Sequence, residues 1–595
     1  MPKYISKELS IQNAKVFKDS LSLADTSTLK QSTILYAVLG RAEAYADEGT
    51  TPTPVETDQD KHYELWRQAW AGKRITSGDV SHVVPRHNWT TGTVYAMYRD
   101  RDTNLYGRAF YVITEQNNVY KCLKNNKGGA STVRPTGFST TGFTTSDGYH
   151  WKYMYSVSLG RADKFMTASY MPVQNILSSA GSTEDDRQSL VQDAAANGSI
   201  EVIETFNVGA GYQQLANGVA ESATTTTVTL STTSGDAGSP VDNFYNGASL
   251  YVISGSGSGQ LRRIVDYTGA TKTLTVNTAF QTLPNTDSTM IISPTVTIIG
   301  DGLGAKAYAK VNTSTGAIAN VFMITTGTGY RRASALITSN SSHGTGATAN
   351  VIMSPVGGHG KDAIRELGGD KLLLNAQFEG SLGVSATARG YIPANTSFRS
   401  ISLLKDPILK VNSSNVPNVS GSEFIANTSN SPVNLRLSTE LLISYQSMNG
   451  AVPVNALAAG DTITHERARL SAELGTLQFV TELSPTVRSN SVVAMANAVK
   501  AANADIIYIR NDEVTSDTSF FTMYINNVES YADIVPFTKD DILLKRGSTT
   551  EVATVSTITG PEANTFSGQF LHTENISKIT RSLDQTEDIK IILDF

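Results

Sequence analysis

Short apolar and aromatic runs separated by turn residues extend over most of the chain, a pattern typical of β-strands. Before residue 130 such runs predict strands at residues 94–98, 109–113 and 118–123. After residue 370 they predict strands at residues 372–378, 398–404, 440–445, 506–510, 520–525 and 589–595. Helical spacing of apolar residues is confined to short segments, at residues 60–71, 182–195, 361–367 and 489–502. The pattern predicts a mainly β fold, between all-β and α+β, with sandwich-like or barrel-like domains and a few short helices.

The middle of the chain contains an internal repeat. The motif GLGAKA at residues 302–307 recurs as GTGATA at residues 344–349, and the segment 200–212 resembles the segment 318–330. These matches predict two copies of one small β unit. Residues 216–293 interrupt the first copy. They carry few charges and are rich in threonine, which suits paired strands, so we expect an inserted β domain there.

These features divide the chain of 595 residues into three predicted regions, consistent with domains of about 100–200 residues each. Residues 1–175 hold all four tryptophans and are predicted to form an aromatic-rich α+β domain. Residues 176–355 are predicted to form a glycine-rich β repeat domain that contains the insertion at 216–293. Residues 356–595 are predicted to form one or more β-rich C-terminal domains with a helix near residues 489–502.

The composition narrows the class of protein. Charged residues make up 17% of the chain, against roughly 25% in an average soluble protein, and 47 glycines accompany many serines and threonines. This composition excludes a coiled coil. A net charge of -6 with 24 tyrosines and 19 phenylalanines argues against disorder, since such a chain can build cores. No apolar run approaches the length of a membrane span, so no membrane insertion is expected.

Cysteine usage and the N-terminus bear on where the chain folds. Cys122 is the single cysteine, so we expect neither an intrachain disulfide nor a multi-cysteine metal site. The first residues, MPKYIS, are not followed by the apolar core of a signal peptide. We therefore expect folding in a cytoplasm. The slightly acidic pI of about 5.8 gives no reason to expect nucleic acid as a partner.

Glycine-rich segments are the first candidates for chemistry. The cluster GSGSG at residues 255–259 resembles a phosphate-binding loop, but its sequence context favours a hairpin turn over a strand–loop–helix site. The segment GGHGKD at residues 357–362 has a Gly-Lys pair, yet Asp362 stands where a magnesium-binding hydroxyl would be required. A glycine-rich turn before a helix explains that segment better.

Other catalytic and metal-binding patterns are also weak. None of the eight histidines pairs with another at the i, i+4 spacing of a helical metal site. His82 and His87 suit loop or packing positions better than metal coordination. No serine lies in a Gly-x-Ser-x-Gly elbow between a strand and a helix. The sequence therefore predicts no enzyme and no catalytic, metal-binding or cofactor-binding residues, and leaves the binding residues unknown.

Several motif blocks are distinctive as sequence. The first block comprises YELW (63–66), VPRHNWT (84–90), YVITEQNNVYKC (111–122), PTG (135–137) and SDGYHWKYMY (146–155). The second comprises GGHG (357–360), IRELGG (364–369) and NAQFEG (375–380). The third is RSISLLKDP (399–407), and the last is ITRSLDQTED (579–588). Together, and in this order, they resemble the baseplate wedge protein family (gene product eight) of T-even-like contractile-tailed bacteriophages.

The resemblance implies a non-enzymatic, mostly β structural subunit of the virion. Such a subunit would dimerise, contact other wedge proteins around the baseplate hub, and assemble in the host cytoplasm. The chain is much longer than the smaller members of that family, and the surplus includes residues 216–293 and residues 408–505. The resemblance says nothing about what these additions contact.

A receptor-binding or carbohydrate-binding tail component is the alternative. Threonine-rich β repeats could present Tyr212, Tyr245, Tyr251 and Tyr330 as platforms on which sugars stack. Packing of the same tyrosines in a core or an interface is the simpler interpretation. A polysaccharide hydrolase is a third hypothesis, and it would require paired carboxylates in a cleft.

Overall fold

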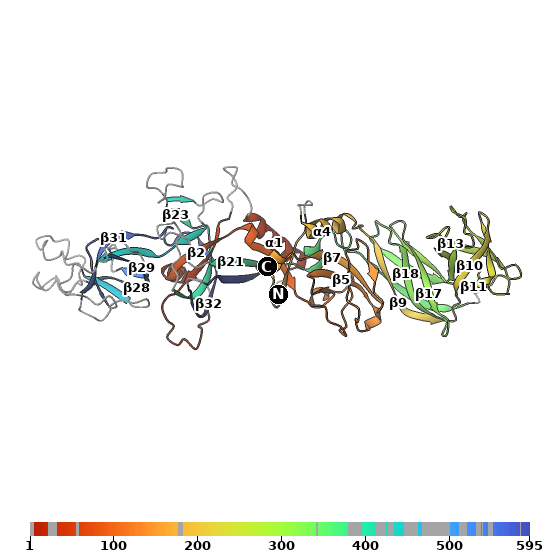
Figure 1. Cartoon of the computed structure of the whole chain (residues 1–595), viewed down its shortest axis with the longest axis horizontal. Coiled ribbons are helices and arrows are strands. Elements are labelled where there is room, and N and C mark those ends of the chain that lie inside the picture. The colour runs from red at the N-terminus through yellow and green to blue at the C-terminus, as the bar shows by residue number, and fades with distance from the viewer. Residues whose placement is uncertain are drawn as a thin grey trace, which may run out of the picture. The chain divides into compact units, whose positions relative to one another are not determined.

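The structure is a computed structural model that describes residues 5–21, 33–54, 59–176, 182–340, 343–378, 396–410, 423–425, 433–444, 462–466, 500–510, 520–530, 537, 539–545, 551–582 and 585–595. Over these residues it contains 33 β-strands and five α-helices, so the fold is mainly β, as predicted. None of the described helices is long and apolar enough to cross a membrane. The chain forms two compact units (Figure 1): unit 1 comprises Met1–Ile11 and His82–Asp370, and unit 2 comprises Gln12–Ser81 and Lys371–Phe595.

The two units differ from the three predicted regions. Residues 12–81 were expected in an N-terminal domain but belong to unit 2. The reason is that β1 (Leu35–Gly40) pairs antiparallel with β2 (Ala69–Ile75) on one side and with β22 (Ser397–Lys405) on the other. Pairing between strands so far apart in sequence leaves no local pattern. The rest of the aromatic-rich region and the repeat region both lie in unit 1.

The aromatic-rich part of unit 1 is built on a four-stranded antiparallel sheet. Its strand order is β4 (Tyr111–Ile113), β5 (Asn118–Asn125), β7 (Tyr149–Ser156) and β6 (Phe143–Thr144). Helix α4 (Thr183–Asp193) packs on β7, and the side chain of Ser182 caps it by accepting a hydrogen bond from the backbone of Asp185 at 3.0 Å. The predicted helix at 182–195 is thus confirmed. Near this sheet, β3 (Val80–Pro85) pairs with β8 (Tyr170–Val173), and α3 (Leu159–Phe165) packs on β8.

The predicted repeat forms one curled six-stranded sheet. Its strands are β9 (Ile200–Ala210), β16 (Thr295–Gly300), β17 (Lys306–Asn312), β18 (Ala317–Thr325), β19 (Ala333–Thr338) and β20 (Thr345–Met353). They are ordered β18-β17-β16-β19-β20-β9, so the copy β9, β16, β17 and the copy β18, β19, β20 occupy symmetric positions. Each copy pairs its last strand with the first strand of the other. The two edge strands also meet, since the backbone N–H of Ile200 donates to Thr326 at 2.9 Å and that of Tyr212 to Gly316 at 2.8 Å.

The Gly-x-Gly-Tyr turns of the repeat form two equivalent corners. In one, the ring of Tyr330 lies so close to Gly302 that a Cβ atom there would come within 2.4 Å of it. In the other, Tyr212 stands in the same relation to Gly344, again at 2.4 Å. Both tyrosines are buried. Glycine at these positions is therefore required by the close approach of a ring, which explains why the motif recurs.

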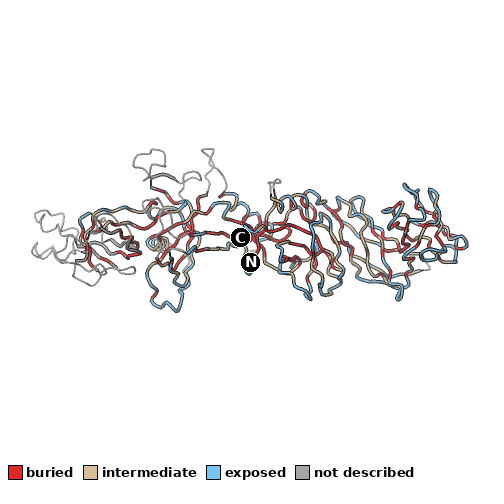
Figure 2. The backbone as a smooth tube through the Cα atoms, viewed as in Figure 1, coloured by how far each residue is buried: buried red, intermediate tan, exposed pale blue. Residues whose placement is uncertain are grey.

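Residues between β9 and β16 form a separate closed barrel. Its strands are β10 (Leu215–Ala223), β11 (Thr227–Gly235), β12 (Ser249–Ser254), β13 (Leu261–Thr268), β14 (Thr273–Val276) and β15 (Thr289–Ser293). Side chains such as Leu250, Val252 and Leu274 fill its interior, and Figure 2 shows both buried and exposed residues along the barrel. The predicted insertion at 216–293 coincides with this barrel. The second repeat copy has only a short turn at the corresponding place, between β18 and β19.

Unit 2 contains a five-stranded sheet, a strand pair and a second closed barrel. The sheet is ordered β25 (Asn434–Arg436), β2, β1, β22 and β32 (Gln569–Thr580), while β21 (Lys371–Phe378) pairs with β33 (Glu587–Asp594). The barrel consists of β26 (Thr439–Ser444), β29 (Phe520–Ser530), β28 (Lys500–Arg510), β27 (Thr462–Glu466), β30 (Ile542–Lys545) and β31 (Glu551–Thr559). A short pair, β23 (Ile408–Lys410) with β24 (Glu423–Ile425), is also present.

Three sequence predictions of local structure need correction. Residues 94–98 form no strand, because only isolated backbone hydrogen bonds hold them while Tyr95 and Tyr98 are buried. The helix predicted at 60–71 is α2 (Gln59–Gln68), and it ends early because the next residues pair with β1 as β2. Of the helix predicted at 489–502, residues 489–499 lie outside the described residues and the rest begins β28. Helix α1 (Lys7–Ser20) was not predicted.

Candidate functional site

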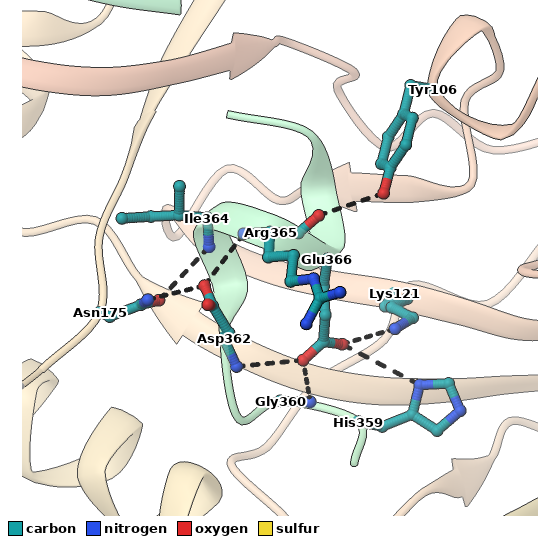
Figure 3. A network of polar contacts seen from close by, with 9 residues as sticks. All are labelled: Tyr106, Lys121, Asn175, His359, Gly360, Asp362, Ile364, Arg365 and Glu366. Atoms are coloured by element: carbon teal, nitrogen blue, oxygen red, sulfur yellow. Dashed lines mark hydrogen bonds and ion pairs between the residues drawn. The ribbon is translucent and has the colours of Figure 1, made fainter. Parts of the chain in front are cut away.

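The glycine-rich segment at 357–369 folds against the aromatic-rich sheet (Figure 3). It ends in the short helix α5 (Ala363–Leu367), whose N-cap Asp362 accepts a hydrogen bond from the backbone N–H of Arg365 at 3.0 Å. The side chain of Asn175 donates to Asp362 at 2.7 Å and fixes the cap from a distant part of the chain. Gly368 closes the helix in the left-handed region, with φ of 78°. These contacts hold the face of α5 that carries Glu366 toward the sheet.

Glu366 is the centre of a buried polar network. Its side chain is 1% exposed and that of Lys121 on β5 is 0% exposed, and their Nζ and Oε2 atoms are 2.6 Å apart. The other carboxylate oxygen accepts hydrogen bonds from the backbone N–H of Gly360 at 2.7 Å and of Asp362 at 3.3 Å. A buried carboxylate is tolerated only with such partners, so Lys121 and the glycine turn together hold this charge in the interior.

Two rings complete the surroundings of Lys121. Its Nζ lies 4.2 Å from the centroid of the Tyr98 ring, which is a cation–π contact, and Tyr98 meets His359 edge-on at 4.9 Å between centroids. The Nδ1 atom of His359 is 4.0 Å from Glu366, and this nitrogen is buried without a hydrogen-bond partner. Burial, and secondarily the nearby Lys121 and Lys152, lower the pKa of His359 well below 6.5, so the ring is neutral at pH 7.

A second group of charges lies between the aromatic-rich sheet and the repeat sheet. Lys152 and His150 on β7 are near Glu201 on β9, and burial raises the pKa of Glu201 while Lys152 and Lys121 act in the opposite direction. Burial lowers the pKa of both lysines. We call Lys121, Lys152, Glu201, His359 and Glu366 the polar seam.

Two further contacts near the polar seam reach the repeat sheet from the aromatic-rich part of unit 1. Lys124 on β5 donates to the side chain of Asn320 on β18 at 3.0 Å. Arg99 forms an ion pair with Glu204 on β9 at 2.7 Å. The aromatic-rich part and the repeat sheet of unit 1 are therefore joined by charged and polar side chains together with apolar contacts of Val202 and Ile352. Because desolvated charges tolerate little displacement of their partners, this junction favours one fixed arrangement of the two sheets.

The polar seam is suited to holding structure together. Lys121, Lys152 and Glu366 are each at most 3% exposed, so a solute in water cannot reach them in this arrangement. Over the described residues, no group of three or more His, Cys, Asp and Glu side chains is placed to hold a metal ion. The Nδ1 atom of His359, which has no hydrogen-bond partner, faces Glu366 and lies near Lys121, and that cation opposes binding of a metal.

The candidates considered from sequence occupy ordinary structural positions. Residues 255–259 form the turn between β12 and β13, and residues 357–360 form the turn before α5, as their sequence context favoured. His82 is buried, and its Nδ1 lies 2.8 Å from the backbone oxygen of Gly369. The ring of His87 packs against Tyr111 at 5.1 Å between centroids.

The tyrosines of the sugar-binding alternative are mostly inside the protein. Tyr212, Tyr245 and Tyr330 are each at most 7% exposed. Tyr251 is half-buried, and its ring stacks on Tyr308 at 5.1 Å between centroids. Three of the four therefore present no ring face to a sugar.

Sequence reasoning missed the polar seam. Its members come from β5, β7, β9 and the segment at 357–367, which only the fold brings together. One local pattern could have pointed to it. Lys121 and Lys152 each interrupt an aromatic and apolar strand, in VYKCL at 119–123 and in HWKYM at 150–154. A lysine inside such a strand requires either exposure or a buried partner.

Comparison with known proteins adds no family assignment. Neither a protein-family model nor a curated protein matches the sequence.

His150, which lies on β7 beside the polar seam, leads to a prediction about acid stability. Burial, together with Lys124 and Lys152, lowers the pKa of His150 from 6.5 to about 4. The unfolded chain therefore binds more protons than the folded chain between these pH values, and the free energy of unfolding falls as the pH falls through this window. For His150 the loss reaches roughly 3 kcal/mol at the acid end. Urea unfolding followed by tryptophan fluorescence at several pH values measures it.

His150→Gln is the matched control for this pH dependence. It keeps a polar group near Thr144, whose hydroxyl lies 2.9 Å from the ring of His150. The variant should lose less stability than the original protein between pH 6.5 and 4.5, because glutamine takes up no proton. Parallel pH profiles for the two proteins would contradict the assignment.

Proposed function

We propose that this chain is a structural subunit of the baseplate wedge of a contractile phage tail. The observation that carries the proposal is the ordered series of motif blocks between residues 63 and 588, which resembles the gene product eight family. The subunit acts through protein contacts and not through catalysis. It resides in the virion, after assembly in the host cytoplasm, and neither binds nucleic acid nor inserts into a membrane.

The polar seam supports this proposal because four of its five residues come from the same motif blocks. YVITEQNNVYKC contributes Lys121, SDGYHWKYMY contributes Lys152, and GGHG with IRELGG contributes His359 and Glu366. Residues of two separate blocks thus meet inside one unit and hold α5 against the aromatic-rich sheet. Such a role fits a protein that works as a structural subunit and not as an enzyme.

The proposed mechanism is assembly through large, weakly charged β surfaces. The subunit binds a twin copy and other wedge proteins, and some of these contacts rearrange when the tail contracts. Polar interfaces of moderate strength suit such rearrangement better than fully apolar ones. The mainly β fold, which includes two closed barrels, is compatible with assembly through β surfaces. Burial of Tyr212, Tyr245 and Tyr330 makes the sugar-binding alternative weaker.

Size-exclusion chromatography with light scattering on the purified full chain tests the proposal. The expected mass is about twice the chain mass of 63.7 kDa, with a further increase when other wedge proteins of the same phage are added. The control is a mixture with an unrelated protein of similar size, which should leave the mass unchanged. A strict monomer that binds no wedge protein would count against the proposal.

A further inference from the structure

Lys121 and Glu366 are positioned as the two reactants of an amide bond (Figure 3). The Nζ atom of Lys121 lies 2.6 Å from Oε2 of Glu366, and the two side chains are 0% and 1% exposed. Contact enforced by the fold replaces a random encounter between an amine and a carboxyl group, which can accelerate such a reaction by several orders of magnitude. The exclusion of bulk water also protects an amide, once formed, from hydrolysis.

Burial brings the amine of Lys121 closer to its reactive, uncharged form. It lowers the pKa of Lys121, with Lys152 acting in the same direction and Glu366 in the opposite one. The hydrogen bond from Nζ to Oε2 offers a path along which the ammonium passes one proton to the carboxylate. The result is an uncharged amine, which is the nucleophilic form, beside a carboxylic acid. A site of low polarity disfavours charged groups, so this transfer costs less here than at the protein surface.

The turn before α5 supplies the electrostatic stabilisation that amide formation needs. When an amine adds to the carboxyl carbon Cδ of Glu366, negative charge develops on Oε1. That atom already accepts hydrogen bonds from the backbone N–H groups of Gly360 at 2.7 Å and Asp362 at 3.3 Å. Two backbone donors directed at one developing oxyanion form an oxyanion hole. The side chain of Asn175 donates to that of Asp362 at 2.7 Å, so these donors are held in place before the reaction.

We propose that Lys121 and Glu366 condense in the folded chain, from the ion pair described above, to an intramolecular amide between Nζ and Cδ. The ammonium passes a first proton to Oε2, the amine adds to Cδ, and a second proton leaves the nitrogen for Oε2. Oε2 then departs with both protons as water, so one C–O bond breaks, one C–N bond forms and no oxidant or cofactor is needed. His359 can relay the second proton, because its Nδ1 atom has no hydrogen-bond partner among the described residues and lies 4.0 Å from Oε2.

The amide closes a covalent loop between residues that are 245 positions apart in the sequence. The loop contains the whole repeat sheet and the barrel formed by β10 to β15. A cross-link of this kind stabilises the folded state mainly by restricting the unfolded chain, as a disulfide does. The chain has a single cysteine, Cys122, and so cannot obtain such a link from an intrachain disulfide. The inference concerns the covalent structure of unit 1 and does not depend on the proposed function.

Mass spectrometry of the purified full chain under denaturing conditions tests the inference. The expected mass is about 18 Da below that of the sequence, because the condensation of amine and carboxyl group releases one water molecule. Trypsin cleaves after lysine and arginine, but not after a lysine whose amine is acylated. Digestion should therefore yield a branched peptide in which residues 109–124 are joined to residues 366–371. Fragmentation of this peptide should place the link at Lys121 and Glu366.

Lys121→Arg keeps a cation next to Glu366 but has no primary amine, so this variant should have the full mass of its sequence. Lys61 and Glu64 provide an internal control in the digest of the original chain. Their N···O distance is 2.7 Å, but their side chains are 36% and 45% exposed to water, so they should remain unjoined. The inference would be overturned by a full mass of the original chain with the two peptides separate, by an equal mass loss in Lys121→Arg, or by a link at other residues.

Discussion

Replacing Lys121 with methionine is expected to lower the free energy of unfolding of unit 1 by about 3–5 kcal/mol. Methionine fills similar volume, but it leaves the carboxylate of Glu366, which is 1% exposed, without its cation. The N–H groups of Gly360 and Asp362 remain, and they cannot neutralise the charge. The loss arises from the uncompensated buried charge, which costs more than the ion pair itself contributes.

Hydrogen exchange of peptides from β5 and β7 measures this loss locally, because a chain with two units need not unfold in one step. Arg134→Met is the matched control in the same unit. Arg134 forms an exposed ion pair with Glu115 at 3.2 Å, so its loss should cost less than about 1 kcal/mol. The double variant Lys121→Met with Glu366→Gln should recover part of the stability, since the amide oxygen can still accept from Gly360. Equal effects of Lys121→Met and Arg134→Met would contradict a central role for the polar seam.

Gly209→Ala is the second substitution with a large expected effect, a loss of about 2–5 kcal/mol. Gly209 has φ of 61°, and a Cβ atom there would lie 2.5 Å from the backbone oxygen of Thr345 and 2.7 Å from the backbone nitrogen of Ala347. Both neighbours are backbone atoms of β20, so they cannot move without breaking the pairing of β9 with β20. Gly327, the equivalent residue in the second copy of the repeat, is equally crowded and should behave alike.

Gly247→Ala separates the two causes of this loss. Gly247 has φ of 82°, yet no atom lies within 4 Å of a Cβ placed there. Its substitution should cost only the left-handed strain of roughly 1–2 kcal/mol. Hydrogen exchange of β9 and β20 for Gly209→Ala, and of the barrel strands for Gly247→Ala, measures both. If the two variants lost the same stability, the crowding of β9 against β20 would not explain why position 209 requires glycine.

Local patterns predicted those elements whose cause is local. The acidic, serine-capped segment at 182–195 forms α4, and the apolar and aromatic segment at 118–123 forms β5, because capping and β-propensity act within a few residues. The motif matches also identified the repeated β copies. Their interleaving, in which β17 pairs with β18 and β20 with β9, could not be read from the matches. It depends on which strand each edge meets after folding.

The parts that sequence reasoning missed depend on contacts over long distances along the chain. Residues 69–71 continue the apolar spacing of α2, yet they become β2 because β1 is available as a partner. In the same way, nothing near Glu366 in the sequence indicates that Lys121 will neutralise it. The sequence suggested turns and a short helix around residues 357–367 and gave no reason to expect a buried charge there. In both cases, contacts with residues far away in the sequence determine the local structure.

A density map of an intact contractile tail containing this protein, with the chain traced, tests the proposed role most directly. The proposed function predicts two copies of the chain per wedge, arranged around the central hub and in contact with other wedge proteins. The role would be contradicted if the chain were absent from the baseplate, or if it lay at the tip of a tail fibre as a receptor-binding component.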